Sequence, residues 1–289
     1  MQDIKRMQNE EEILQLLFSQ RKFYDDSEKY SNLSWVFAVI MFLVSLINII
    51  FNIPVLYSTL SIAVLTIIIL VMEKLSMRCV KIGAATKKYI DFKLFGFNDN
   101  NFGFTKEEIK EFAINKRRKY PEEYIAQISN TGTDEIKGVK DWYVFEATGS
   151  RWKDIYTCQK QNIWWNGALS KKYVYLLISS SIFIILLFIG ISLVVNPSAR
   201  NLWIAVASNV GLFIKIFEDI KSGIKYYQAY HSAQVKTEIF DTKSELSEED
   251  MKGLQSDIDK IRNIKFLVPD FLHRKNSIVL HDIYRSLFG

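Results

Sequence analysis

Two stripes of polar side chains run through otherwise apolar stretches of this sequence. Their candidate members are Ser45, Asn48 and Asn52 in the first stripe, and Ser208, Asn209 and Lys215 in the second. Spacings of three and four residues place the first set on one face of a helix, and the second set repeats the theme. Because polar side chains are costly against lipid, both stripes should face protein or water. Two interpretations stay open: the side chains cement helix packing, or they line an aqueous path when several copies assemble.

A second group of residues could bind an anionic or nucleotide ligand. The candidates are Lys116, Arg117, Arg118, Lys119, Trp142, Tyr143 and Trp152. The consecutive cations could bind anionic lipid headgroups or a phosphorylated ligand, and the aromatic rings could stack on a nucleobase. A structural role is equally open for the cations, because positive charge is favourable at a helix C-terminus.

Motifs of the common enzyme classes are missing from the sequence. It contains no Walker loop, no GxSxG, no HExxH and no paired-cysteine motif. Cys79 and Cys158 lie far apart in polar surroundings, which suggests free thiols in a reducing compartment. The histidines have no zinc-like spacing to each other or to the cysteines. We therefore predict a protein that is not an enzyme and that uses no metal and no cofactor.

The elements that position the polar stripes are predicted membrane spans. No charged residue occurs from Tyr30 to Met72 or from Tyr173 to Ala199, and a bilayer core needs about 20 apolar residues as a helix. The first run is long enough for two spans, with a turn at residues 52–54, and the second run for one. A fourth span over 202–217 is short and polar, so hydropathy alone leaves it open.

The distribution of positive charge decides whether the fourth span crosses. The segment 73–172 carries 19 Lys and Arg residues and the tail after residue 217 carries 11, whereas the first hairpin turn has none and the second has Arg200. Basic residues concentrate on the cytoplasmic side of a membrane, so both segments should lie there and four spans result. The alternative is a three-span protein with its basic tail outside. Aromatic anchors expected at the membrane interfaces are Trp35, Trp164, Trp165 and Trp203.

We therefore predict an all-α polytopic membrane protein with four transmembrane helices in two hairpins and a mainly helical cytosolic domain. The predicted divisions are 1–32 (N-terminal helix), 33–72 (hairpin one), 73–172 (cytosolic middle region), 173–217 (hairpin two) and 218–289 (C-terminal helices). Within the cytosolic part, Thr105 with Glu108 and Ser247 with Asp250 have the spacing of helix-capping pairs.

The whole organisation resembles a bacterial family, the four-transmembrane pore-forming effectors associated with SMODS-type nucleotide cyclases. The similar stretches are 11–24, 92–97, 141–143 with 158–166, and 261–262 with 269–271; the segment 158–166 (CQKQNIWWN) is the most specific. One stretch departs from the family pattern, because 144–147 reads VFEA where the family has prolines and a Leu-Pro-Leu segment.

This resemblance implies a role in antiphage defence. A cyclase that senses infection would make a cyclic nucleotide, and the effector would then oligomerise or open and permeabilise or depolarise the inner membrane. The implied partners are the lipid bilayer, further copies of the chain, and a nucleotide from a nucleotidyltransferase, with no nucleic acid polymer. Both termini would be cytosolic. A small-solute transporter or a scaffold that recruits a cytosolic partner is the alternative; a transporter should show matching interrupted spans in its two halves, and the predicted hairpins offer only turns.

Overall fold

The structure is a computed structural model that describes residues 3–51, 55–97, 101–167 and 169–269, together with 271–272, 275–276, 279–280, 282–283 and 286. The predicted pore-lining residue Asn52 lies outside the described residues.

Helices make up the described fold, which confirms the predicted all-α class. They are α1 (Ile4–Met7), α2 (Glu11–Phe51), α3 (Val55–Phe95), α4 (Lys106–Lys119), α5 (Pro121–Ser129), α6 (Arg151–Gly167), α7 (Ser170–Val195), α8 (Ala199–Ser208), α9 (Val210–Asp241) and α10 (Glu248–Arg262). The described residues form no strand, and their one isolated bridge joins Thr131 to Lys140.

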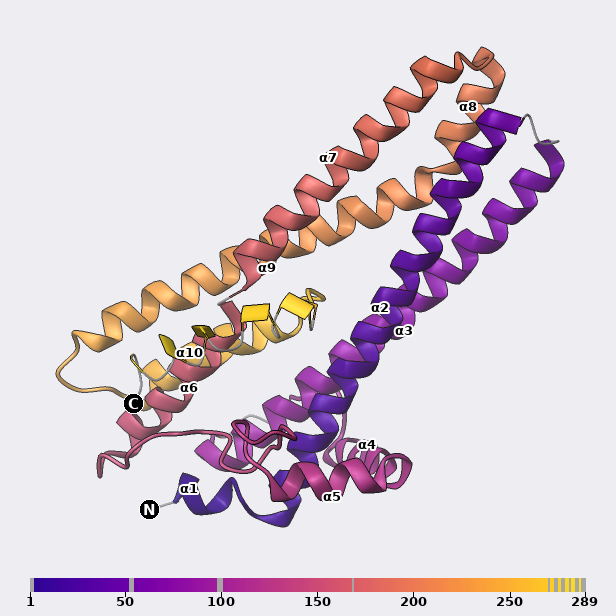
Figure 1. The fold of residues 1–289 in the computed structure, drawn as a ribbon. Coiled ribbons are helices and arrows are strands. Elements are labelled where there is room, and N and C mark those ends of the chain that lie inside the picture. The colour runs from indigo at the N-terminus through magenta and orange to yellow at the C-terminus, as the bar shows by residue number, and fades with distance from the viewer. Residues whose placement is uncertain are drawn as a thin grey trace.

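Hairpin one, formed by α2 and α3, consists of two continuous helices of 41 residues each (Figure 1). The predicted N-terminal helix and first span are one helix, so the expected division at 32/33 falls inside α2. Ser27 and Ser76 join the two helices, because each hydroxyl lies 2.9 Å from the other residue's carbonyl oxygen. Helix α3 continues past the predicted end of hairpin one at residue 72 and stops at Phe95, before Gly96, which has a φ of 69°.

Hairpin two, formed by α7, α8 and α9, contains an interruption that the sequence prediction missed. The fourth span was expected as one helix over 202–217, but α8 ends at Ser208 and α9 begins at Val210. The side-chain amide of Asn209 donates to the Ala205 carbonyl oxygen at 2.9 Å. A polar side chain that binds backbone carbonyls in this way competes with the regular helical pattern and favours a local break.

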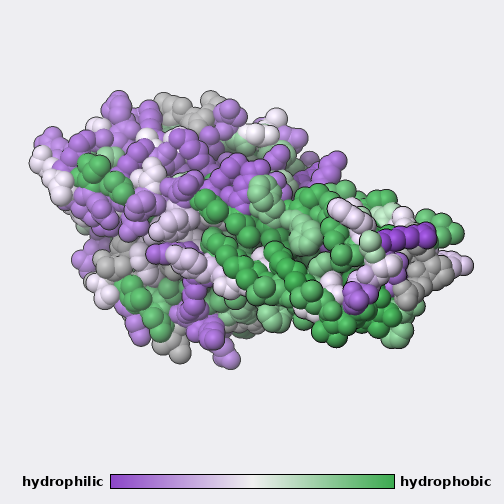
Figure 2. Space-filling view, turned by 90° about the horizontal axis from the view of Figure 1, so that it is seen from above, coloured by the Kyte–Doolittle hydropathy of each residue, from purple (hydrophilic) through white to green (hydrophobic). Residues whose placement is uncertain are grey.

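The two hairpins form the apolar end of the molecule. Three described helical stretches are long and apolar enough to cross a bilayer, within Glu11–Phe51, Thr59–Phe95 and Arg151–Val195. Helix α8 with the start of α9, where the fourth span is predicted, is too interrupted to qualify by length. Figure 2 shows hydrophobic side chains gathered at this end and hydrophilic ones at the other. Large side chains such as Phe183 and Leu193 are exposed by 65% and 77%, as expected for lipid contact.

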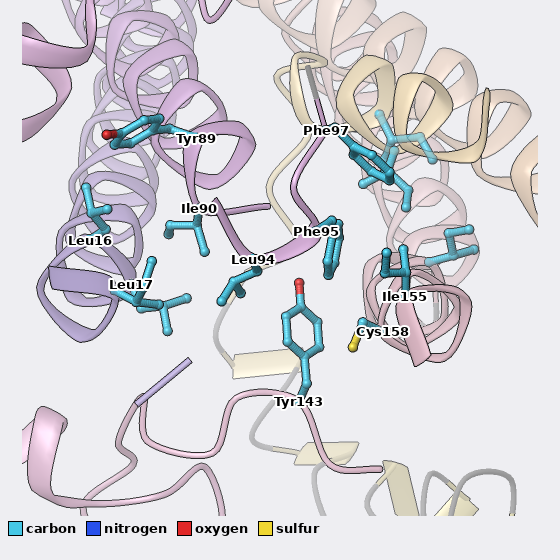
Figure 3. Close-up of a cluster of buried hydrophobic side chains, with 14 of the residues drawn as sticks. Leu16, Leu17, Tyr89, Ile90, Leu94, Phe95, Phe97, Tyr143, Ile155 and Cys158 are labelled. Carbon is cyan, nitrogen blue, oxygen red and sulfur yellow. The ribbon is translucent and has the colours of Figure 1, made fainter. Parts of the chain in front are cut away.

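We call the other end the polar domain. It contains α1, α4, α5, α6 and α10, together with the N-terminal part of α2 and the C-terminal parts of α3 and α9. Its core is a cluster of buried apolar side chains into which Tyr143 points, towards Phe95 (Figure 3). Both predicted capping pairs are confirmed: Thr105 and Glu108 form a reciprocal capping box at α4, and Ser247 and Asp250 form one at α10. The two cysteines are free.

Candidate functional site

The two polar stripes meet inside the apolar bundle. The Asn209 side chain donates to the Ser45 hydroxyl at 2.7 Å, and Asn48 and Ser208 are each exposed by 4%. The described members of both stripes therefore lie in the interior of the bundle, between α2 and the α8–α9 segment. The carbonyl oxygen of the Asn209 side chain is buried without a hydrogen-bond partner, and an unsatisfied buried polar atom destabilises the packing around it.

A group of charged side chains closes the polar end of this bundle, and we call it the mouth cluster. Its members are Trp35 of α2, Glu73 of α3, Lys215 and Asp219 of α9, and Lys265 of the segment after α10. The Lys215 ammonium lies 2.6 Å from Asp219 Oδ2 and 2.9 Å from Glu73 Oε1. The second approach is an ion pair without the alignment of a hydrogen bond. Lys265 also pairs with Glu73, and the Trp35 indole donates to Asp219 at 2.9 Å.

The mouth cluster is electrically balanced and largely closed to solvent. Two cations face two carboxylates, and the Lys215 side chain is exposed by 2%. A cavity of about 20 Å³ lies beside Asp219 and Lys265, lined also by Ser31 and Tyr173, which is room for one water molecule. A buried charge that loses its partner is strongly unfavourable. The mouth cluster is therefore stable either when all its charges are paired or when all of them are hydrated.

A second charged group lies deep in the polar domain, and we call it the core network. Its members are Lys87 and Asp91 of α3, Tyr143, Asn162 of α6, and Gln255 and Arg262 of α10. Asp91 is fully buried and accepts from Arg262 at 2.6 Å, from Gln255 at 3.0 Å and from the Tyr143 hydroxyl at 3.0 Å. The Tyr143 hydroxyl in turn accepts from Asn162 at 2.9 Å. The network joins three helices and one loop around a single carboxylate.

Burial and charge shift the pKa values in this network. Burial raises the pKa of Asp91, but the neighbouring Arg262 and Lys87 charges outweigh it and hold the pKa below its ordinary value. Burial lowers the pKa of Lys87 to about 8 in spite of Asp91, 3.5 Å away. Burial raises the pKa of nearby Asp259 to about 6. These side chains are satisfied by each other, which favours a structural role over ligand binding.

The mouth cluster and the core network lie along one face of α3. Glu73 and Asp91 are 18 residues apart, which is five helical turns and about 27 Å. Their partners Lys265 and Arg262 are only three residues apart, at the end of α10 and just beyond it. The short segment 262–265 therefore connects the polar core to the mouth of the bundle.

The predicted ligand-binding residues do not come together as one site. Lys116 is buried, pairs with Asp26 and lies over the Phe23 ring. Arg117, Arg118 and Lys119 are all exposed, and Arg117 approaches Glu11 at 3.4 Å. The four consecutive cations thus divide between packing contacts and open surface, which favours the structural interpretation for Lys116.

The predicted aromatic candidates also fail to form one site, because Trp142 and Tyr143 lie beside Lys87 whereas Trp152 lies elsewhere. Tyr143 belongs to the core network, and Trp142 is 37% exposed with the Lys87 ammonium 5.1 Å from its ring centre. Trp152 lies apart, stacked with its neighbour Arg151 at 4.8 Å.

The expected interfacial tryptophans lie in different surroundings. Trp203 is exposed by 73%, as an interfacial anchor would be. Trp164 and Trp165 contact each other edge to face at 4.8 Å and pack near Leu169. Trp35 is instead part of the mouth cluster.

Sequence reasoning missed the charged residues that organise both groups: Glu73, Lys87, Asp91, Arg262 and Lys265. The 18-residue spacing of Glu73 and Asp91 was a usable signal, since it places both acids on one helix face. Nothing in the sequence indicates that Lys265 reaches Glu73. The described residues contain no group of His, Cys, Asp and Glu side chains arranged to hold a metal ion.

Comparison with known proteins gives a match over nearly the whole chain. The family described as the SMODS-associating 4TM effector domain matches residues 2–277. No curated protein and no solved structure matches the chain.

Proposed function

The chain belongs to the family of SMODS-associating 4TM effectors, and from this premise we propose that it permeabilises the bacterial inner membrane when a cyclase-made nucleotide activates it. The polar domain would lie in the cytosol with both termini, because it carries the basic segments expected there. A SMODS-type nucleotidyltransferase would supply the signal. The function is that of a binding-activated membrane device, without catalysis of its own.

The observation that carries this proposal is the contact between the two polar stripes. Ser45 and Asn209 bond to each other, and Asn48 and Ser208 are buried nearby, between helices whose outer faces are apolar. Small polar residues also cement ordinary helix packing, but the unsatisfied Asn209 oxygen is unfavourable in a role of pure packing. Because the stripes of one chain fill the space between them, a conducting path would require separation of the hairpins and assembly of several chains.

The mouth cluster supplies a reason for the closed state to persist without a signal. Separation of α9 from α3 would part Lys215 from Glu73, and it would expose charges that now neutralise each other. A nucleotide would open the bundle only if it bound the open state more tightly than the closed one. Such a ligand would act on the polar domain, from which the segment 262–265 leads to the mouth cluster.

The test is depolarisation of the inner membrane in cells that express the chain with or without an active nucleotidyltransferase. A potential-sensitive dye should report depolarisation only with the active cyclase. The variant Asn48→Leu with Ser208→Leu should reduce it, whereas the lipid-facing pair Ile47→Leu with Val210→Leu, on the same two spans, should not. Unchanged depolarisation in the first variant would rule out the stripes as the pathway.

A small-solute transporter is the second candidate, and the break at Asn209 is the observation that favours it. Transporters often bind substrate at paired interrupted helices, and no matching interruption occurs in the described part of hairpin one. Substrate-dependent uptake into vesicles without leakage of a dye would favour the transporter. Recruitment of a cytosolic protein with neither uptake nor leakage would favour a scaffold.

A further inference from the structure

One face of α3 carries an unusual continuous stripe that is exposed along its whole length. In chain order its members are Leu60, Val64, Ile67, Val71, Lys74, Arg78 and Lys81. The spacing alternates between four and three residues, so all seven side chains lie on one side of the helix. The apolar members are exposed by 47% to 61%. The stripe therefore changes from apolar to basic at one level of the helix.

The three basic members stand apart from most other cations near the bundle. Lys215 and Lys265 are paired in the mouth cluster, and Lys116 is paired with Asp26. Within the described part of the chain, no carboxylate forms an ion pair with Lys74, Arg78 or Lys81. Three cations one turn apart repel each other unless an anion from outside neutralises them.

The depth of these cations matches that of lipid headgroups. The second span is predicted to end at Met72, so a rise of 1.5 Å per residue places Lys74 about 3 Å and Lys81 about 14 Å beyond it. The headgroup layer extends about 5 to 8 Å beyond the hydrocarbon core, and long basic side chains extend towards it along the helix. All three cations can therefore reach phosphates in that layer.

We propose that this stripe is a binding site for an anionic phospholipid. The acyl chains would lie along Leu60, Val64, Ile67 and Val71, and the phosphate would be held between Lys74, Arg78 and Lys81. The arginine can donate two parallel hydrogen bonds to phosphate oxygens, and the lysines add positive charge on either side. A headgroup with a net negative charge is required, because a zwitterionic one carries its own cation.

The continuity of the stripe separates this ligand from other phosphates. Inorganic phosphate or a nucleotide could use the cations but would leave the apolar part of the stripe unused. A phospholipid contacts both parts of the stripe at once. Its acyl chains span one leaflet of the bilayer, as does the apolar part of the stripe. Under this proposal hairpin one binds an anionic lipid whether or not the protein forms a pore.

The experiment compares lipid retention by native mass spectrometry of the full chain purified in detergent with added phosphatidylglycerol or phosphatidylcholine. The wild type should retain phosphatidylglycerol preferentially. The variant Lys74→Gln with Arg78→Gln and Lys81→Gln should bind it about 100-fold more weakly, from about 1 kcal/mol per basic residue. The matched control changes three exposed cations of the polar domain, Lys137→Gln with Lys140→Gln and Lys153→Gln, and should bind as the wild type does.

Three results would overturn the proposal. They are equal retention of phosphatidylcholine, unchanged retention by the stripe variant, and displacement of the lipid by inorganic phosphate at millimolar concentration. If the triple variant does not fold, Arg78→Gln alone should still weaken binding several-fold, and Arg78→Lys should recover part of that loss. Equal binding by Arg78→Gln and the wild type would also count against the site.

Discussion

Hairpin one and hairpin two both contain long apolar stretches, but their helices differ in continuity. Helices α2 and α3 run without interruption from the bilayer into the polar domain and contribute to its core. Hairpin two is broken at Asn209, between α8 and α9, and its cation Lys215 is tied to hairpin one in the mouth cluster. Apolar side chains of both hairpins also pack together, so hairpin two is distinguished by its break and by the polar contacts at that break and in the mouth cluster.

A close approach at Gly223 adds to this contrast. A side-chain carbon at this position of α9 would lie 2.7 Å from Val174 of α7 and 2.8 Å from Phe266, next to Lys265. Glycine is therefore needed for α9 to pack against both α7 and the segment after α10. Hairpin two is thus in direct contact with the segment that also reaches the core network.

The largest expected effect lies on the side of hairpin one. Arg262→Met would leave Asp91 of α3 buried and without its strongest partner, and loss of one member of a buried pair costs about 3 to 5 kcal/mol. Chemical denaturation in detergent should show this loss in the polar domain. The surface variant Lys252→Met, which removes a cation from the same helix α10, should change the free energy of unfolding by less than about 1 kcal/mol. A similar loss of unfolding free energy for both variants would contradict a large contribution of the core network to stability.

The next effect concerns the connection between the hairpins. Lys215→Met should leave Glu73 and Asp219 short of positive charge at the mouth of the bundle. We expect a loss of about 2 kcal/mol in unfolding free energy, from the lost hydrogen bond to the charged Asp219, and membrane depolarisation without a nucleotide signal. The double variant Lys215→Met with Asp219→Asn keeps the cluster neutral and should restore part of the stability and reduce the leak. If the single variant stays closed until activation, the mouth cluster does not hold hairpin two.

A smaller effect on stability, with a clear effect on activity, is expected from the break itself. Asn209→Leu with Ser45→Ala removes both partners of one buried hydrogen bond and replaces them with apolar groups, which is close to neutral for stability. The regular helix that results should make hairpin two resemble hairpin one, and nucleotide-induced depolarisation should fall. Thermal unfolding and dye release measured on the same preparation would test this, and full activity would show that the break is incidental.

The last expected effect is a pH dependence near the core network. Burial raises the pKa of Asp259 to about 6, so between about pH 4 and pH 6 the folded protein holds a proton that the unfolded chain has released. The contribution of this group to stability therefore falls as the pH rises through that window. Asp259→Asn should flatten the fall in the unfolding midpoint between these pH values, and an unchanged slope would show that another group causes it.

Local features could be read from the sequence because they depend on neighbouring residues. The uncharged runs predict long apolar helices, and the capping boxes at Thr105 and Ser247 follow from residues three positions apart. The pairing of Lys215 with Asp219 is likewise one helical turn. The break at Asn209 was missed, because the same side chain fits an unbroken helix until its amide binds the Ala205 carbonyl and the Ser45 hydroxyl.

By itself, therefore, the sequence determined the helical class, the spans and the polar stripes, since hydrophobicity and helical periodicity act over a few residues. Only the tertiary structure decided that the stripes face each other, that Lys116 is a packing residue, and that Lys265 reaches Glu73 across 192 positions of the chain. Such contacts depend on how separate helices pack. A charge has no assigned partner until that packing brings two distant residues within a few ångströms and excludes the water between them.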